Sequence, residues 1–257
     1  MNQSERRNYL IQKLLEEQPQ YAKMQIPGRC EEQKMLLRSL MNIRMPGKIS
    51  KEFQQIQDAY LAEENAAKGV VTPADMEELS PEIYLWKGDI TRLQVGAIVN
   101  AANSGMTGCY QPCHNCIDNC IHTYAGIELR NYCNDIMQRQ GYAEPTGQAK
   151  ITPAFNLPCD YVIHTVGPIV QGRLTEEHER LLVSCYEACL RIAEENNIES
   201  IAFCCISTGV FMFPNERAAE LAIQTVKQYK DRTKSKIKVI FNVFKEDDER
   251  IYRRFLG

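Results

Sequence analysis

Apolar residues recur at helical spacing through roughly the first seventy residues of the chain, and turn-forming residues separate them into groups. Each group lies on one face of a predicted helix: Leu10, Ile11, Leu14 and Leu15; Met35, Leu36, Leu40 and Met41; and Phe53, Ile56, Tyr60 and Leu61. Ser4 is a candidate cap for the first helix, and the third is expected to start after Ser50. We therefore expect a small helical extension over residues 1–75, joined by a linker near 69–81 to a domain over 76–257.

From residue 83 onward the pattern changes to short runs of β-branched and apolar residues that alternate with helical stretches. The predicted strands are Ile83–Trp86, Ala97–Asn100, Ala149–Thr152, Tyr161–Thr165, Ser200–Ile206 and Lys238–Val243. The predicted helices cover residues 117–139, 175–196, 214–230 and 247–255. This alternation predicts an α/β layer fold, with helices on both faces of a largely buried sheet. Ligands of such folds bind beyond the carboxyl ends of the strands, so the residues that follow each strand are the candidates for chemistry.

The composition is that of an ordinary globular protein: 257 residues, 44% hydrophobic and 25% charged, with a formal net charge of −3. Basic and acidic residues are balanced and no long basic run occurs, which argues against binding to nucleic acid or to an anionic membrane. No apolar stretch reaches the roughly 18 residues of a membrane helix, and residues 1–12 are too polar for a signal peptide. We expect the protein to be cytoplasmic.

Eleven cysteines are the main compositional anomaly of the chain, and an odd number without an export signal favours reduced thiols. Seven lie among apolar neighbours and are expected to be small buried side chains: Cys30, Cys133, Cys159, Cys185, Cys189, Cys204 and Cys205. The other four, at positions 109, 113, 116 and 120, fall within twelve residues that also contain His114. Such a cluster indicates a metal site or catalysis more often than a disulfide, and the alternative is a cysteine-rich loop without metal.

Small and polar residues follow three of the predicted strands. They form the segments 88–91, 100–105 and 207–209. A carboxylate such as Asp89 could accept a hydrogen bond from the amino group of an adenine, and the backbone N–H groups around Gly209 could face a pyrophosphate. Taken singly, each segment is more typical of an ordinary turn than of a ligand site.

Together and in this order, the motifs resemble the macrodomain family, which binds and often processes ADP-ribose. The resemblance runs from about Tyr84 to the C-terminus and rests on the segments 87–91, 98–104, 121–126, 146–149, 161–168 and 206–211. It implies a three-layer α/β/α fold with a mixed central sheet. It also implies that Asp89 selects adenine and that Asn103 reaches the distal ribose. The remaining substrate-binding residues that it implies are Ile90 and the diphosphate cradle Ser207, Thr208, Gly209, Val210 and Phe211.

The loop after Gly108 departs from the common hydrolase pattern and resembles a zinc-dependent, sirtuin-operon-linked branch of the family. Cys109, His114 and Cys116 match the Cys-x4-His-x-Cys spacing of that branch, and the resemblance implies that they bind Zn²⁺. Two thiolates and an imidazole suit this borderline-soft ion, and three ligands leave one position open for catalysis. A fourth ligand from Cys113 or Cys120 would instead make the site structural.

Asp118 lies at the start of a predicted helix, where the hydrolase branch has its acidic residue. The resemblance implies a catalytic role, whereas the position alone is more typical of a helix cap or of a partner for the helix dipole. His122 and His164 lie in apolar strings and are expected to be structural. Tyr110 and Phe211 are candidates to enclose the distal ribose, with packing in the core as the alternative.

These residues favour a hydrolase that removes mono-ADP-ribose from acidic side chains of a modified protein, with Asn103 and Asp118 as catalytic residues. One alternative is a reader module that binds ADP-ribose and uses zinc only to shape its loop, because the same fold serves both functions. Another is an O-acetyl-ADP-ribose deacetylase. The resemblance further implies a sirtuin-like transferase as pathway partner and a lipoyl-carrier protein as a possible modified substrate.

Overall fold

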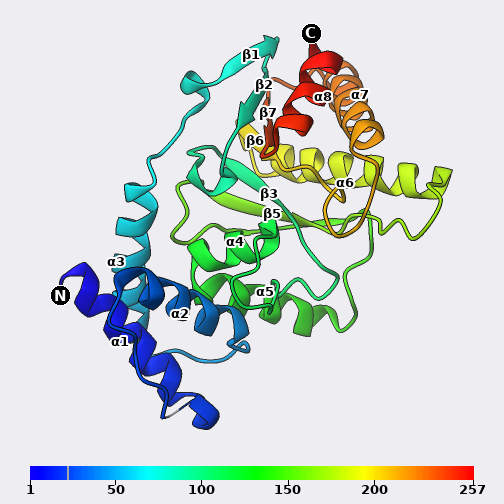
Figure 1. Cartoon of the computed structure of the whole chain (residues 1–257). Helices are drawn as coiled ribbons and strands as arrows, with labels where there is room; N and C mark the ends of the chain where they lie inside the picture. The colour runs from blue at the N-terminus through cyan, green and yellow to red at the C-terminus, as the bar shows by residue number, and fades with distance from the viewer. Residues whose placement is uncertain (22) are drawn as a thin grey trace.

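Strands from both halves of the chain combine into one sheet in the computed structural model, which describes residues 1–21 and 23–257 (Figure 1). The strands are β1 (Glu77–Ser80), β2 (Ile83–Lys87), β3 (Ala97–Ala101), β4 (Ala149–Pro153), β5 (Tyr161–Thr165), β6 (Ser200–Phe203) and β7 (Lys238–Val243). The α-helices are α1 (Gln3–Glu16), α2 (Cys30–Ile43), α3 (Lys51–Ala67), α4 (Ile117–Ala125), α5 (Ile127–Gln140), α6 (Glu176–Glu195), α7 (Asn215–Thr233) and α8 (Glu246–Leu256). Short 3-10 helices cover Pro19–Tyr21, Pro73–Asp75 and Ile90–Arg92.

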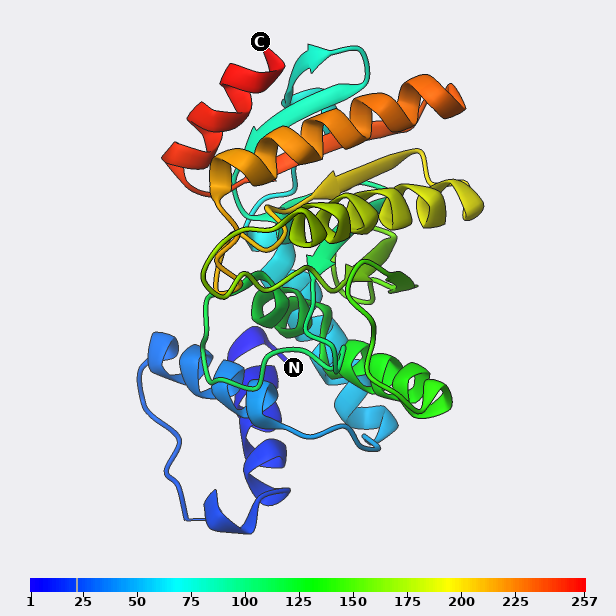
Figure 2. The same cartoon turned by 90° about the vertical axis from the view of Figure 1, so that its right-hand side faces the viewer.

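The strand order is β1-β2-β7-β6-β3-β5-β4, and the five inner strands run parallel. The two edge strands, β1 and β4, are antiparallel to their neighbours, which makes the sheet mixed. Helices α6, α7 and α8 pack on one face of the sheet, and α4 and α5 pack on the other (Figures 1 and 2). The predicted three-layer α/β/α fold with a mixed sheet is therefore confirmed. The parallel arrangement also brings the carboxyl ends of β2, β3, β6 and β7 to one edge.

The predicted N-terminal helical part is present as α1, α2 and α3, which lie against α4 rather than against the sheet (Figure 1). These helices bury a hydrophobic cluster of their own, to which α5 contributes Ile127. The main core lies between the sheet and the helices on both of its faces. Two separate cores agree with a division near residue 75, and that boundary stays a prediction.

Four predicted element boundaries were wrong, one of them the end of the strand expected over 200–206, which stops at Phe203. Asn2, not Ser4, caps α1. Its side-chain oxygen accepts a hydrogen bond from the backbone N–H of Glu5, and the Glu5 carboxylate accepts one from the backbone N–H of Asn2. The helix expected over 117–139 is broken at Gly126, whose φ of 103° is open to glycine and ends α4 before α5 begins. The expected linker contains β1, a short edge strand whose half-exposed, polar residues carry no apolar alternation.

The cysteines are all free of disulfides, as expected from the odd count. Five of the seven expected in the interior are buried, whereas Cys205 is half-buried and Cys30, at the start of α2, is exposed. Within the described ranges, no helix is both long enough and apolar enough to cross a membrane.

Candidate active site and metal centre

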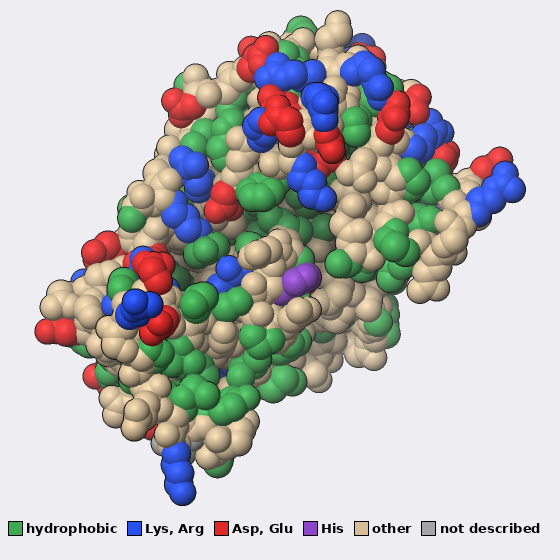
Figure 3. Space-filling view, viewed as in Figure 1, with side chains coloured by type: hydrophobic (Ala, Val, Ile, Leu, Met, Phe, Trp, Pro, Cys, Tyr) green, Lys and Arg blue, Asp and Glu red, His purple; other side chains and the backbone are tan. Residues whose placement is uncertain are grey.

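The three polar segments named from the sequence meet at the edge formed by the carboxyl ends of the parallel strands. Asp89 follows β2, Asn103 follows β3 and the segment from Ser207 follows β6. On the face that Figure 3 shows, basic and acidic side chains are interspersed rather than gathered into a single basic patch.

The two carboxylate oxygens of Asp89 have different partners. Its Oδ1 accepts the backbone N–H of Thr91 at 3.0 Å and the Thr91 hydroxyl at 2.7 Å, which fixes the turn. Its Oδ2 lies 3.6 Å from Lys68 Nζ, and 35% of the side chain is exposed. The neighbouring Ile90 is buried in the core, so only its backbone is available to a ligand.

Lys68 comes from the end of α3, in the part of the chain that the sequence suggested was a separate appendage. Its ammonium group stands over the ring of Tyr124, 2.7 Å from the centroid, and burial lowers its pKa to about 8. The sequence carries no signal for this contact, because α3 and Asp89 are brought together only by the packing of the N-terminal helices. These helices therefore place a cation beside the candidate adenine-binding carboxylate.

The segment 207–211 forms a loop that is held at both ends by backbone hydrogen bonds. Phe213 N donates to Ser207 O at 3.0 Å, and Val170 N donates to Phe211 O at 2.8 Å, so both ends of the loop are tied down. Among residues 1–21 and 23–257, no hydrogen bond is donated by the backbone N–H of Gly209, Val210 or Phe211.

Open space lies over this loop. A Cβ added at Gly209 would meet no atom within 4 Å. The Thr208 hydroxyl donates to Cys205 O at 3.0 Å, inside the loop, while the Val210 side chain is 71% exposed. Backbone N–H groups without an internal partner beside open space can bind an anion.

Asp118, in the first turn of α4, accepts hydrogen bonds from two side-chain amides. Asn100 Nδ2 donates to its Oδ1 at 2.8 Å, and Asn103 Nδ2 donates to its Oδ2 at 3.1 Å. The Asn103 amide also donates to Gly108 O at 3.1 Å, which ties the start of the cysteine loop to the same group. Both amides come from the exit of β3, so the strand orients the carboxylate.

The electrostatics of Asp118 are set by burial. Loss of hydration raises its pKa to about 6, against the opposing effects of the Asn100 hydrogen bond, the Arg130 charge and the Asn103 hydrogen bond. Cys116, not Asp118, is the N-cap of α4, because its sulfur accepts the backbone N–H of Asn119 at 3.4 Å. The alternative role of Asp118 as the helix cap is therefore not what the geometry shows.

His122 and His164 lie beneath Asp118 in the interior. Burial keeps the pKa of both imidazoles low, to about 3 for His164, so both are neutral. His164 is hydrogen-bonded to Asn100 and Thr152, at 3.1 and 3.0 Å. With Cys133 the two histidines form a second group of donors within 4.8 Å, but all three are buried without exposure to the site. His164 is thus hydrogen-bonded, as expected of a structural histidine, whereas neither ring nitrogen of His122 has a hydrogen-bond partner within residues 1–21 and 23–257.

Cys109, His114 and Cys116 bring one donor atom each to within 4.8 Å of one another. The Cys109 sulfur lies 3.6 Å from His114 Nδ1. Tetrahedral zinc with bonds of about 2.3 Å to sulfur and 2.0–2.1 Å to nitrogen separates two such ligands by about 3.6 Å, so the donors fit this ion. Burial raises the pKa of the Cys116 thiol to about 12, so binding of a cation requires release of a proton. The three residues could hold a metal ion.

The two remaining loop cysteines point away from these donors. Cys113 Sγ contacts Ser39 Oγ at 3.2 Å and Met35 O at 3.4 Å, and Cys120 Sγ lies 3.6 Å from Arg38 Nη2. Neither belongs to the three-donor group. The geometry thus favours an open position over a closed four-ligand site.

The aromatic residues that could contact a ligand differ in how firmly their side chains are held. The Tyr110 hydroxyl donates to Thr107 at 3.1 Å, and the guanidinium of Arg130 stacks on its ring at 4.3 Å, so this side chain is held within the loop. Phe211 is half-buried. Phe244, which sequence reasoning missed, is 76% exposed directly after β7, next to the segment that carries Asp89. The sequence could have indicated Phe244 as a candidate, because it is the first residue after a predicted strand.

Comparisons with known proteins agree with this architecture. The sequence pattern of the Macro domain matches residues 99–222. The chain is 57% identical over 261 residues to a Treponema medium protein named protein-ADP-ribose hydrolase, with all of both chains covered. It is 43% identical over 253 residues to a protein of the same name from Staphylococcus aureus strain MSSA476, covering 96% of this chain and 94% of that one. The Trypanosoma brucei macrodomain in complex with ADP-ribose matches with a TM-score of 0.67 and 27% identity, over 86% of this chain and 95% of that one.

Proposed function

This chain belongs to the macrodomain family, and from that membership we propose that it is a protein-ADP-ribose hydrolase. The observation that carries the proposal is the buried Asp118 carboxylate, held on both oxygens by Asn100 and Asn103 beside the three-donor loop. Burying a carboxylate lowers the stability of the folded protein. Such groups are therefore found more often at sites where they react with a substrate than elsewhere.

We propose that ADP-ribose lies along the edge of the sheet. The Oδ2 of Asp89, which accepts no hydrogen bond from Thr91, would accept the adenine amino group, and the exposed Phe244 ring would stack on the base. The free N–H groups around Gly209 would bind the diphosphate, and the Asn103 amide would orient the distal ribose. This order places the distal ribose between Asp118 and the cysteine loop.

The metal of this proposal is Zn²⁺, held by Cys109, His114 and Cys116. When bound, it supplies Lewis-acid chemistry at the ribose end of the substrate. The matching distance between the Cys109 and His114 donors supports this assignment, and the thiolate ligands favour a soft or borderline ion over Mg²⁺ or Ca²⁺.

The proposed substrate is a protein that carries mono-ADP-ribose on an aspartate or glutamate. A water positioned by Asp118 attacks C1″ of the distal ribose and gives its proton to the Asp118 carboxylate. The bond from C1″ to the ester oxygen breaks, and the electron pair leaves with the carboxylate of the modified protein. Because a carboxylate is a stable leaving group, the step needs a base and orientation rather than a strong acid. A pKa of about 6 leaves Asp118 ionised and basic at neutral pH.

The reader and O-acetyl-ADP-ribose deacetylase alternatives make different predictions in one experiment. Purified protein is incubated with aspartate- or glutamate-linked ADP-ribosylated protein and, separately, with the acetyl ester, and single-turnover release is measured. Release from protein supports the hydrolase, whereas turnover of the acetyl ester alone supports the deacetylase. Binding without turnover of either supports the reader. A lipoyl-carrier protein as substrate extends the same proposal and is tested by using its ADP-ribosylated form in the assay. A sirtuin-like transferase as pathway partner is tested by asking whether such an enzyme makes the linkage that this protein releases.

A further inference from the structure

The N-terminal helix α2 touches the cysteine loop with one continuous face. Met35, Arg38, Ser39 and Asn42 lie at helical spacing, and each contacts the loop or the start of α4. Residues so spaced share one side of a helix. The contacts cross the seam between the N-terminal layer and the macrodomain, so their arrangement depends on the docking of α2.

Arg38 binds the loop at the residue that carries the imidazole donor. Its Nη2 donates to His114 O at 2.7 Å and to Asn119 Oδ1 at 3.0 Å. The amide of Asn119 in turn donates to the backbone carbonyls of Cys109 and Gln111, at 3.3 and 2.9 Å. A single side chain of α2 therefore acts on the backbone of two of the three donors, one directly and one through Asn119.

Asn42 holds the turn of the loop between the donors. The residue is buried, and its Oδ1 accepts the backbone N–H of Cys113 at 2.9 Å while its Nδ2 donates to Thr123 Oγ1 at 2.9 Å. Cys113 has a φ of 52°, in the left-handed region that is unfavourable for a residue with a side chain. The Asn42 bond stabilises this conformation, which turns the chain just before His114.

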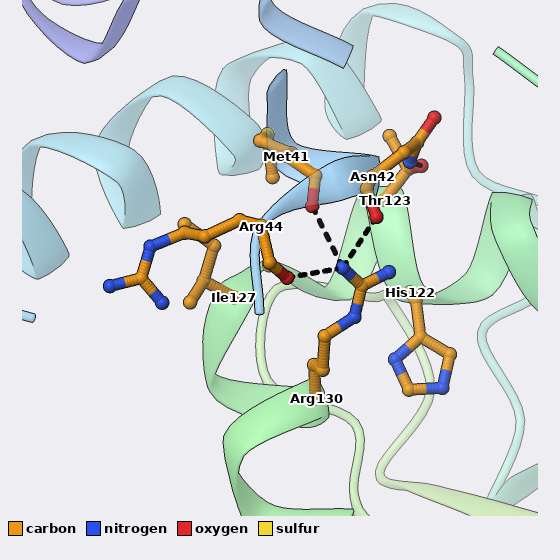
Figure 4. Close-up of a pocket in the computed structure, with 8 residues that line it drawn as sticks. Met41, Asn42, Arg44, His122, Thr123, Ile127 and Arg130 are labelled. Carbon is orange, nitrogen blue, oxygen red and sulfur yellow. Dashed lines mark hydrogen bonds between the residues drawn. The ribbon is translucent and has the colours of Figure 1, made fainter. Parts of the chain in front are cut away.

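Arg130 of α5 closes the seam from the other side. Its Nη1 donates to the carbonyls of Met41, Asn42 and Arg44 at the end of α2, as Figure 4 shows. Its Nη2 donates to Cys109 O at 3.4 Å. The cavity lined by these groups lies between α2, α4 and α5 and has room for about one water molecule, so α2 has little space to shift against α4 and α5.

We infer that α2 is a positioning element of the metal centre, in which Asn42 and Arg38 hold the loop so that Cys109, His114 and Cys116 converge. This inference rests on the zinc site of the proposed function. Neither residue contacts the metal donors' sulfur or ring nitrogen atoms, so both act through the loop backbone. Groups that orient metal ligands in this way affect affinity by about 10- to 100-fold when they are removed.

The test compares metal binding by full-length Asn42→Leu with that by Asn65→Leu. Asn65 is a matched control, because it is a buried asparagine of α3 that also crosses the seam, to Tyr124 O and Asn156 O, without touching the loop. Zinc affinity is measured by competition with a chromophoric chelator, and ligand geometry by the visible absorption of the Co²⁺-substituted protein. Thermal melting with chelator present shows which variants remain folded.

We expect Asn42→Leu to weaken zinc binding by roughly 10- to 100-fold and to change the Co²⁺ spectrum, with Asn65→Leu within about 2-fold of the parent. Arg38→Met, at a less buried position, is the second variant if Asn42→Leu does not fold, and the same weakening is expected. If Asn42→Leu and Arg38→Met both fold and both keep the zinc affinity and Co²⁺ spectrum of the parent, the inference about α2 is wrong while the zinc site itself stands. Absence of stoichiometric metal binding in the unaltered protein would overturn the zinc site and, with it, this inference.

Discussion

Asp89→Asn separates ligand recognition from folding at the candidate adenine site. The Asp89 Oδ1 atom accepts two bonds from Thr91, and an asparagine oxygen can keep both of them. Only Oδ2 remains for a ligand, and the substitution replaces this acceptor by an amide donor. The turn should therefore survive while the acceptor for the adenine amino group is lost.

The magnitude follows from one charge-assisted hydrogen bond. Its loss costs about 1.5–3 kcal/mol of binding free energy, which raises the Kd for ADP-ribose roughly 10- to 150-fold. The pair with Lys68 is partly exposed, at 35% for Asp89 and 22% for Lys68. Its removal therefore changes the free energy of unfolding by at most about 1 kcal/mol.

The assay is calorimetric titration with ADP-ribose and with its hypoxanthine counterpart, in which an oxygen replaces the amino group. The parent protein should prefer ADP-ribose, and Asp89→Asn should lose or reverse that preference. Asp75→Asn is the matched control, because Asp75 makes the equivalent bonds to Thr72 at 2.8 Å, away from the site. Equal affinity and unchanged preference in Asp89→Asn would show that the residue serves only its turn.

Three further predictions concern the metal, the phosphate loop and acid stability. Cys109→Ser should lower the zinc content, whereas Cys113→Ser should leave it nearly intact because that sulfur faces α2; equal content by metal analysis would refute the ligand assignment. Gly209→Val should abolish most ADP-ribose binding by filling the open space, while Gly28→Val, which is equally uncrowded, should not; equal titrations would contradict the cradle. Burial lowers the folded-state pKa of His164 to about 3, so the unfolded chain takes up the proton first as the pH falls. This one group should lower the stability by up to about 1.4 kcal/mol per pH unit between about pH 6.5 and pH 3, and His164→Asn should remove that part of the slope in urea unfolding; an unchanged slope would contradict the linkage.

The sheet and its ligand-facing edge were predictable because buried strands leave a strong local signal. Runs such as Tyr161–Thr165 and Lys238–Val243 are apolar and β-branched, and the structure forms strands with these same bounds. The polar segments that follow β2, β3 and β6 all lie at the edge where the parallel strands end, since parallel strands share an edge. The short strand β1 left no such signal, because its exposed edge needs no apolar alternation.

The parts of the site that come from the N-terminal helices were not predictable from local pattern. Lys68, Arg38 and Asn42 look like ordinary polar positions of amphipathic helices, and nothing in their spacing points to Asp89 or the cysteine loop. Their roles arise from how the helical layer docks on α4. For the same reason the segment was expected to be an appendage, although it contacts both the candidate adenine carboxylate and the loop that could hold a metal.

The central claim, that Asp118 acts on a bound ADP-ribosyl group, is tested most directly by measuring rate and affinity on one variant. Asp118→Ala should bind ADP-ribose within a few-fold of the parent protein, since the adenine and diphosphate contacts remain. Its single-turnover release of ADP-ribose from an acidic-residue linkage should fall by about 100-fold or more, the size expected for a positioned base. A variant that stays folded by thermal melting and releases ADP-ribose at the parental rate would contradict the mechanism.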